Sequence, residues 1–477
     1  MFHVKTYNRS YLDMWNARMC RPSVEPLVDS VVVAVLKQQG FKTLSYVPRN
    51  LYDPAALFEA LQAYAPEHSY FVDFDNPEVC AGMRLAFKAF AKPRAVEKLK
   101  PVRLDGSLSE IYSLLDIKGD RSAGLTAYGQ TKAEAFPTAM RKVRELLTNE
   151  RQPEPCLAGT RTQAGKLGRL VWGYPLMMTI IEGVIARPLL NYLKRNPVTP
   201  MAFGQTSAQI GLKMRKAQSH SDYYVSMDAS KFDATIQAGV IKRAFGTFRT
   251  WFDLNEEVGY GKTVGDIFDI VENYFIHTPI VMPHEHGPLL YRGKRHGVPS
   301  GSYFTQLVDS FANVALIGTL DFKFKLKIQL SEIFVLGDDM LFFTNKIPNL
   351  SKFATVLSNH YHMIVNEKKS VWGLSSDDIH FLGREWVCGL PFRGVDNVIE
   401  RAVSPERYRN YGEDKLKGAS LVVASYGFTA MLRGIPTRAN PYQGISGSVV
   451  KHGYTSGLTE FMLKEGFISS RVTPKLY

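Results

Sequence analysis

Two short apolar runs around a pair of acidic residues place the strongest constraint on the fold. Residues Ile333–Leu336 and Met340–Phe343 flank the triplet Gly337-Asp338-Asp339. Both runs are rich in β-branched or aromatic side chains, which favour strands, and a glycine permits a tight reversal between them. The pattern therefore predicts a hairpin with both carboxylates at its tip, where two like charges require a cation such as Mg²⁺ or Mn²⁺. For this motif alone, an Asp-rich surface turn is the alternative.

The balance of charge narrows the class of partner. The 477 residues include 58 Lys and Arg against 45 Asp and Glu, so the net charge is +13, and the pI is near 9.3. Such a chain favours a polyanionic partner, nucleic acid before membrane. The most apolar stretch, Leu170–Leu190, contains Glu182 and Arg187, so it predicts a buried helix rather than a membrane span. The start lacks an apolar signal core, and the four dispersed cysteines favour a reducing compartment over a zinc or disulfide framework.

A further carboxylate follows another predicted strand. Residues Tyr223–Met227 form an apolar run, Asp228 stands at its carboxyl end, and Asp233 comes five positions later. Ligands commonly bind at the carboxyl ends of strands. Asp228 and Asp338 are 110 residues apart (338 − 228), so only the fold can bring them together. If it does, two strand-end carboxylates can hold two cations about 3.5–4 Å apart.

A basic stretch precedes this region. Residues 158–175 place Arg161, Lys166 and Arg169 in a Gly-rich segment that leads into the apolar strand Leu170–Trp172. A loop of this kind can wrap a triphosphate, because Arg gives bidentate contacts and Lys a point charge. A solvated basic hairpin is the alternative.

Two loops of small residues also precede predicted helices. Ser122, Ala123 and Gly124 form a loop that allows another backbone to approach closely, which suits a single-stranded template, although a plain helix-entry loop is the default. The second loop contains Ser300 and Gly301.

The helix after this second loop carries a polar stripe. Thr305, Asp309 and Asn313 are spaced by four, so they share one face. Buried polar groups need hydrogen-bond partners, and ribose hydroxyls would be suitable ones.

Periodicity predicts several further elements but no chemistry for residues 1–105. We expect helices and two more hairpins over the following ranges: helices at Pro175–Leu193, Val240–Trp251, Val264–Phe275 and Leu350–Tyr361, and hairpins at Pro279–Arg292 and around Ile379–Trp386.

Six motifs in chain order carry a family resemblance. They are a basic loop, Asp-x₄-Asp, Ser-Gly-x₃-Thr, Gly-Asp-Asp, Lys-Ser at 369–370 and Phe-Leu-Gly at 381–383. Together they resemble the motifs of viral RNA-dependent RNA polymerases. The sequence Gly297–Gln306 is most similar to the polymerases of partitiviruses, small viruses with double-stranded RNA genomes. The resemblance spans roughly residues 120–385.

The resemblance implies an α+β right hand of fingers, palm and thumb, in which helices back an antiparallel palm sheet. The implied division is as follows: 1–105 an N-terminal part of the fingers or fingertips, 106–220 fingers with the basic loop, 221–275 first part of the palm, 276–295 an inserted hairpin, 296–390 second part of the palm, and 391–477 thumb.

The resemblance also implies roles for individual residues. Asp228 and Asp338 would bind two Mg²⁺ ions, with Mn²⁺ as the substitute, and Asp339 would lie nearby. Arg161, Lys166 and Arg169 would neutralise the triphosphate. Lys369, or else Lys368, would protonate pyrophosphate as a general acid.

The sugar and the strands have their own implied contacts. Asp233, Ser300, Gly301 and Thr305 would line the ribose site and sense its 2′-hydroxyl. The implied RNA contacts are Ser122, Ala123 and Gly124 on the template and Phe381, Leu382 and Gly383 on the primer. The common pattern has Asn four residues after the Thr, whereas here that position is Asp309 and the Asn is Asn313, so either could contact the ribose.

Two alternatives remain at this point. A reverse transcriptase shares the palm chemistry but typically has an aromatic residue before its Asp pair and a bulky side chain at the position of Asp233. A non-catalytic RNA-binding protein on the same fold would be expected to lose a metal ligand. The implied partners are an RNA template and product duplex, nucleoside triphosphates and a viral capsid protein, with no membrane. The implied place of work is the virion interior and the host cytoplasm.

Overall fold

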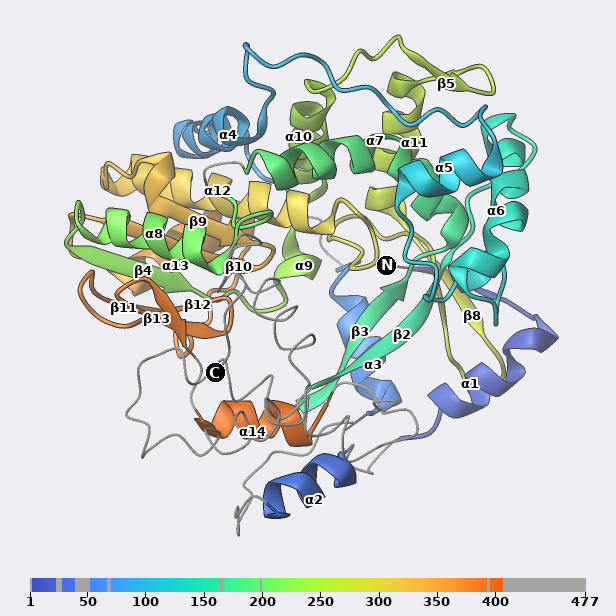
Figure 1. Cartoon of the computed structure of the whole chain (residues 1–477), viewed down its shortest axis with the longest axis horizontal. Helices are drawn as coiled ribbons and strands as arrows, with labels where there is room; N and C mark the ends of the chain where they lie inside the picture. Colours follow the sequence, from blue (N-terminus) through green and yellow to red (C-terminus); the bar gives the residue numbers. More distant parts are fainter. Residues whose placement is uncertain are drawn as a thin grey trace, which may run out of the picture.

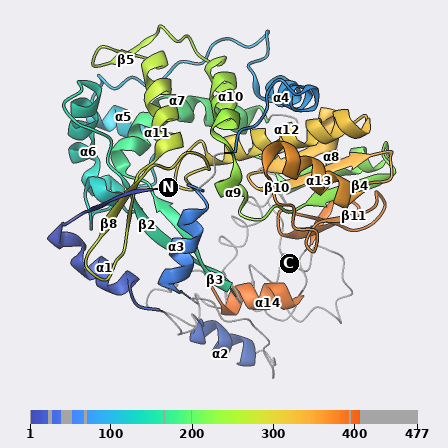
Figure 2. The ribbon, with the colours of Figure 1, turned by 180° about the vertical axis from the view of Figure 1, so that it is seen from behind.

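A computed structural model describes residues 2–22, 28–38, 52–66, 70–163, 166–197, 200–392 and 395–405. Two β-sheets stand apart from each other, and helices from both halves of the chain cover them (Figure 1). The view from behind shows the same separation (Figure 2). One sheet contains the Gly-Asp-Asp hairpin and the other contains the basic stretch.

The first sheet has four antiparallel strands in the order β11-β4-β10-β9. Their bounds are β4 Tyr223–Met227, β9 Ile333–Leu336, β10 Asp339–Thr344 and β11 Val371–Leu374. The predicted strands and hairpin are therefore confirmed. Alternate side chains point to opposite faces of a strand. In β9 and β10 both faces are buried, which explains why these runs are continuously apolar, whereas the edge strand β11 is largely exposed.

Each face of this four-stranded sheet has its own cover. Ile333, Val335 and Phe342 join the large core under two helices, α12 (Thr305–Phe324) and α13 (Leu350–Tyr361). Phe334 and Leu341 join a smaller core with α8 (Ser207–Gln218) and a three-stranded sheet. This small sheet consists of β12 Ile379–Phe381, β13 Arg384–Val387 and β14 Leu390–Phe392, and α14 (Val395–Val403) follows it.

Helix α12 passes beside the four-stranded sheet and is buried along most of its length. The N-terminal helix α4 (Pro77–Phe90) packs along it. The backbones approach so closely that a Cβ at Gly82 would collide with Ala315 O and the side chain of Thr319. Residues far apart in sequence thus brace the helix that carries the polar stripe.

The second sheet has five strands in the order β1-β8-β7-β2-β3. Their bounds are β1 His3–Thr6, β2 Cys156–Gln163, β3 Lys166–Gly173, β7 Ile280–Met282 and β8 Leu289–Arg292. The predicted hairpin at 279–292 is confirmed as β7 and β8.

The basic Gly-rich loop expected over residues 158–169 is wrong as a local structure. These residues form an antiparallel hairpin in which Arg161 pairs with Arg169 and Thr160 with Leu170. The glycines suit strands here because the facing backbone leaves little room, and a Cβ at Gly173 would lie only 2.6 Å from Leu157 O. The alternative of a basic hairpin is therefore the one observed.

Three helices enclose the five-stranded sheet on one side: α6 (Lys132–Leu147), α7 (Leu176–Arg195) and α11 (Val264–His277). Helix α7 is long and apolar enough to cross a membrane, but 72% of its most apolar window is buried inside the fold. This burial agrees with the expectation of a core helix.

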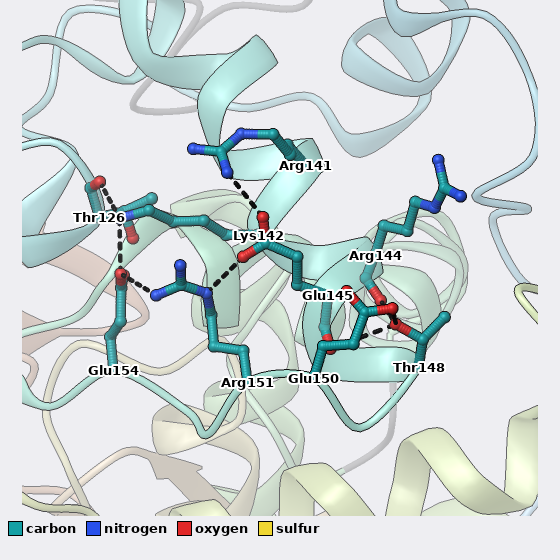
Figure 3. A network of polar contacts seen from close by, with 9 residues as sticks. All are labelled: Thr126, Arg141, Lys142, Arg144, Glu145, Thr148, Glu150, Arg151 and Glu154. Atoms are coloured by element: carbon teal, nitrogen blue, oxygen red, sulfur yellow. Dashed lines mark hydrogen bonds and ion pairs between the residues drawn. The ribbon is translucent and has the colours of Figure 1, made fainter.

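A polar network fixes the path from α6 into β2 (Figure 3). Lys142 Nζ donates to Thr126 O at 2.6 Å and contacts Glu154 Oε1 at 2.7 Å. Arg151 Nε lies 2.6 Å from Glu145 Oε2. The partly buried Lys142–Glu154 pair sets where β2 begins, because it joins the helix to the connection that follows it.

The remaining helices and strands of the described part follow in chain order. They are α1 Asp13–Met19, α2 Ser30–Gln38, α3 Pro54–Gln62, α5 Leu108–Leu115, α9 Phe232–Thr235, α10 Ala238–Arg249, β5 Glu257–Gly259 and β6 Lys262–Thr263. Helices α10, α11 and α13 confirm the predicted helices, with ends shifted by no more than two residues. The expected division into fingers, palm and thumb stays a prediction, and most of residues 391–477 lie outside the described part.

Candidate active site

Strand pairing brings the distant carboxylates together. Strands β10 and β4 are antiparallel, with Met340 opposite Met227. The next residues at that end of the two strands are Asp339 and Asp228, so the tip of the hairpin lies beside the end of β4. The expected approach of Asp228 to the Asp338-Asp339 pair is therefore observed.

Helix α12 forms hydrogen bonds with both the N–H and the C=O of Gly337 at the hairpin tip. Gly337 adopts φ +62°, which explains the need for glycine at the reversal. Asn313 Nδ2 donates to Gly337 O at 2.7 Å, and Gly337 N donates to Ser310 Oγ at 3.1 Å. Part of the predicted polar stripe thus holds the turn that carries Asp338.

The next polar residue on that face points into the acidic cluster. Asp309 is 2% exposed, and its Oδ1 has no hydrogen-bond partner among the described residues. Burial raises the pKa of Asp309 well above its ordinary value, and repulsion from Asp233 and Asp338 adds to this. Asn313 is occupied by its bond to Gly337. Asp309 instead interacts electrostatically with Asp233, the predicted sugar contact.

Asp233 is paired with a cation of the basic hairpin. It lies on the short helix α9 and is 8% exposed, and Arg169 Nη2 lies 2.6 Å from its Oδ2. Burial raises the pKa of Asp233, the charge of Asp338 adds to the rise, and Arg169 opposes it. The pair joins the predicted triphosphate contact to the predicted ribose contact.

Backbone and side-chain bonds fix the position of Asp228. Its N–H donates to Ser370 Oγ at 3.0 Å, and its carbonyl accepts from Asn366 N at 2.7 Å. Lys369 Nζ lies 3.7 Å from Asp228 Oδ2, whereas Lys368 is exposed and makes no such contact. Of the two lysines left open by the sequence, Lys369 faces the acidic cluster.

The cluster has the donor chemistry of a cation site. Burial, then the charges of Asp338 and Asp228, raise the pKa of Asp339 to about 7, although part of its side chain meets solvent at the hairpin tip. No three acidic, histidine or cysteine side chains of the described residues already form a metal cage. Mg²⁺ commonly binds one or two carboxylates together with water and substrate phosphates, so strand-end carboxylates fit this ion.

The Ser-Gly loop packs against the end of the basic hairpin. Trp172 N donates to Ser300 Oγ at 3.2 Å, and a Cβ at Gly301 would collide with Trp172 O. Thr305 Oγ1 donates to Pro299 O at 2.8 Å. Ser300 and Thr305 are thus fixed by their own chain, and their contact with ribose stays a prediction.

The remaining basic residues lie along β2 and β3. Arg161 is exposed, and the register places it beside Arg169. Lys166 is the first residue of β3, and its side chain lies outside the described part. Of the three predicted triphosphate contacts, Arg169 is the one seen to face the carboxylates.

The template contact expected at Ser122-Ala123-Gly124 needs correction. Ala123 and Gly124 are buried, and the backbone that approaches Gly124 is the chain's own, at Tyr174 and Pro175. Ala123 O accepts from Leu176 N at 3.0 Å. Only Ser122 remains exposed for RNA.

The predicted primer support forms a turn between β12 and β13. Phe381 is buried against Phe334, with ring centroids 6.3 Å apart. Leu382 and Gly383 have φ of +55° and +64° and lie nearer the surface. Their contact with a primer stays a prediction.

Sequence reasoning missed several residues that hold the site. Ser310 and Ser370 fix Gly337 and Asp228, and Glu182 on α7 holds the Ser-Gly loop. Tyr64, in the N-terminal part without assigned chemistry, packs on Trp172 with ring centroids 5.0 Å apart. The one available signal was Glu182 itself, a carboxylate inside the most apolar stretch of the chain.

Comparisons with known proteins agree with this geometry. The sequence profile of the viral RNA-dependent RNA polymerase family matches residues 157–403, just over half of the chain. The RNA-directed RNA polymerase of Cryptosporidium parvum virus 1 (strain KSU-1) is 32% identical over 223 residues, 44% of this chain and 39% of that protein. The RNA-directed RNA polymerase of White clover cryptic virus 1 is 26% identical over 272 residues, 50% of this chain and 43% of that protein. The matches thus span less than half the length of these relatives.

Solved structures share the whole fold at low identity. The RNA-dependent RNA polymerase of a human picobirnavirus superposes with a TM-score of 0.68 at 14% identity, covering 96% of each chain. The Sicinivirus polymerase gives a TM-score of 0.65 at 15% identity, covering 94% of this chain and 95% of that one. The right-hand fold expected from the sequence is confirmed, and the profile match shows that this chain belongs to the viral RNA-dependent RNA polymerase family.

Proposed function

We propose that this chain synthesises RNA on an RNA template, transferring nucleotides from ribonucleoside triphosphates by a two-metal mechanism. The observation that carries the proposal is the meeting of Asp228 with Asp338 and Asp339 at one end of the four-stranded sheet, with Arg169 and Lys369 beside them. Carboxylates for cations, a cation for phosphates and an acid for the leaving group then lie on one side of the sheet.

The carboxylates define where the reacting groups would meet. Members of this family use divalent metal ions, and we propose two Mg²⁺, replaceable by Mn²⁺, held by Asp228 and Asp338 with Asp339 nearby. Bound there, the ions would supply Lewis-acid activation of the primer hydroxyl and charge neutralisation at the triphosphate. The bonds from Ser310 and Asn313 to Gly337 keep Asp338 in place, so the protein does not have to reorganise this turn during the reaction.

Arg169 and Asp233 would change partners when a nucleotide binds. Their ion pair satisfies both groups before substrate arrives. The triphosphate competes for the guanidinium, for which phosphate is a good bidentate partner. Asp233 is then free to accept a hydrogen bond from the ribose 2′-hydroxyl, the group that distinguishes RNA from DNA.

Lys369 is placed to act on the leaving group. Its ammonium lies 3.7 Å from Asp228 Oδ2 and its side chain is 53% exposed, so it can reach a bound pyrophosphate. Proton donation there would make it the general acid of the reaction.

The finer parts of the proposal rest on the resemblance in sequence and on charge. The net charge of +13 suits channels for template and product RNA. We further propose a double-stranded RNA viral genome as the natural template, a capsid protein as partner, and action in the virion interior and host cytoplasm.

Incorporation of ribonucleotides on an RNA template with Mg²⁺ tests the proposal. Asp338→Asn should slow synthesis about 10³-fold, because a lost metal ligand costs several kcal/mol of transition-state stabilisation. Asp269→Asn is the matched control, since its side chain is 75% exposed on α11 and, within the described part of the chain, pairs with Arg249 alone, and it should keep full activity.

The same assay separates the alternatives. Preference for deoxyribonucleotides would identify a reverse transcriptase, and tight RNA binding without synthesis would identify a non-catalytic binding protein. Wild-type activity in Asp338→Asn would remove the metal assignment.

A further inference from the structure

A fully buried carboxylate lies behind the Ser-Gly loop. Glu182 is 0% exposed in the middle of α7, between Ile181 and Gly183. No cation pairs with it among the residues that the structure describes, and the positive charge that acts on it from a distance is that of Lys132. A charge buried without a cation is costly unless hydrogen bonds replace its water.

Three donors from two segments supply those bonds. Ser302 Oγ lies 2.8 Å from Glu182 Oε1 and 2.9 Å from Oε2, and Tyr303 N donates to Oε2 at 2.9 Å. Tyr174, just past the end of β3, donates its hydroxyl to Oε1. The carboxylate therefore joins the Ser-Gly loop to the end of the basic hairpin.

The other bonds of this loop lead to the nucleotide site. Val298 N donates to Asp233 O at 2.7 Å, and Trp172 N donates to Ser300 Oγ at 3.2 Å. Glu182 fixes the far end of the loop, at the start of α12. The loop is thus held between the element that carries Asp233 and the strand that carries Arg169.

We propose that Glu182 is a positioning residue that sets the conformation of the loop 299–304 and thereby the choice of ribose over deoxyribose. This inference rests on the proposed function and adds a residue to its site. An apolar side chain would fill the same volume without leaving polar oxygens to satisfy, so a carboxyl group is not needed to fill this part of the core. The carboxylate instead fixes the orientation of the loop, because Ser302 and the N–H of Tyr303 must both face Glu182 to bond its two oxygens.

Those of the described residues that are proposed to bind metal and phosphate are not in contact with Glu182, so its loss should affect recognition of the sugar and not metal or phosphate binding. Glu182 touches neither the carboxylates at the hairpin tip nor Arg169. A displaced loop would move Ser300 and Thr305 relative to Asp233 while leaving the Gly-Asp-Asp turn in place. Loss of Glu182 should therefore raise KM for ribonucleotides more than it lowers kcat.

Glu182→Gln is the main test, because the amide keeps the shape but offers one acceptor oxygen in place of two. We expect kcat/KM for a ribonucleotide to fall about tenfold, the effect of one or two charge-assisted bonds, with most of the change in KM. The kcat/KM for the matching deoxyribonucleotide should change less than twofold, so the ratio of kcat/KM for the ribonucleotide to that for the deoxyribonucleotide should fall.

Thr179→Val on the same helix is the matched control. Thr179 is also buried, and among the described residues its hydroxyl bonds to Pro175 O alone, at 3.2 Å and one turn back, at the N-cap of the helix. It should leave the ratio at the wild-type value. Ser302→Ala removes one donor from the loop side and should narrow the ratio as Glu182→Gln does, and it decides the question if the Gln variant does not fold.

One result would overturn the inference: a ratio of the two kcat/KM values that stays at the wild-type value, whether neither value falls or both fall equally. The result is read in a folded Glu182→Gln protein or, where that protein does not fold, in Ser302→Ala. A wild-type protein that makes no RNA would instead remove the proposed function, so the two failures are distinguishable.

Discussion

Replacing Glu182 by Gln should change how stability depends on pH. Burial raises the pKa of Glu182 from its ordinary 4.5 to about 7, against the opposing bonds from Tyr174, Tyr303 and Ser302. The folded protein therefore holds a proton that the unfolded chain releases above pH 4.5. Because the native state binds more protons, the contribution of this group to the free energy of unfolding is largest at low pH and is lost as pH rises through about 7.

The size of the effect follows from the two pKa values. Folding raises the proton affinity of this carboxyl about 300-fold, which corresponds to about 3 kcal/mol in full, most of it lost between pH 5 and pH 8. The glutamine variant carries no titrating group at this position. The wild-type free energy of unfolding, minus that of Glu182→Gln, should therefore fall by about 2–3 kcal/mol across this interval.

Urea unfolding at several pH values between 5 and 8, without added metal, measures this difference. Subtracting the free energy of unfolding of the variant from that of wild type removes the contributions of the other titrating groups, including the Asp cluster, because both proteins contain them. Thr179→Val, which removes a buried hydroxyl and no ionisable group, is the control, and its difference from wild type should not vary with pH. Parallel curves for wild type and Glu182→Gln would show that the buried carboxyl keeps an ordinary pKa, and the reasoning from burial would be wrong.

Four further predictions concern the site and its partner. Asp233→Ala should lower kcat/KM for ribonucleotides more than for deoxyribonucleotides, since an unpaired buried polar group costs about 1–3 kcal/mol, and an unchanged ratio in steady-state kinetics would contradict this. Asp309→Asn should not lower the unfolding free energy of the metal-free protein at pH 7, because the amide fills the buried site without a carboxylate that Asp233 and Asp338 would repel, and a clear loss in urea unfolding would count against it. Gly301→Ala should cost more than tenfold in kcat/KM while kcat on saturating nucleotide falls less, because its Cβ would push the loop away from Trp172 O. RNA affinity should weaken steeply between about 50 and 200 mM salt, and a binding constant that does not change over that range would argue against RNA channels.

Local pattern alone predicted most of the elements that carry the site. The apolar runs at Tyr223–Met227 and Ile333–Phe343 are strands as predicted, and Leu350–Tyr361 is a helix with the predicted ends. These segments obey simple periodicity because each buries a regular set of side chains, whether on one face or on both. The order of the carboxylates along the chain, at the ends of such strands, was likewise visible in the sequence.

The tertiary structure decided which of these elements meet. Antiparallel pairing of β10 with β4 brings Asp228 to Asp339, and Arg169 reaches Asp233 across 64 positions of sequence. No local pattern specifies these partners, because they depend on how two separate sheets are placed by the helices that cover them. The loop at Ala123-Gly124 shows the same limit, since its small residues did indicate a close backbone approach but not that the backbone would be the chain's own.

The basic hairpin and Glu182 show why the remaining predictions needed the fold. Glycines at 159 and 173 indicated a loop by composition, yet both lie in paired strands, and at Gly173 the facing backbone leaves little room for a side chain. In the sequence, Glu182 indicated only that a charged residue interrupts an apolar helix. Its meaning comes from three donors that the sequence places 8, 120 and 121 positions away, and only packing in three dimensions could bring them to one buried carboxylate.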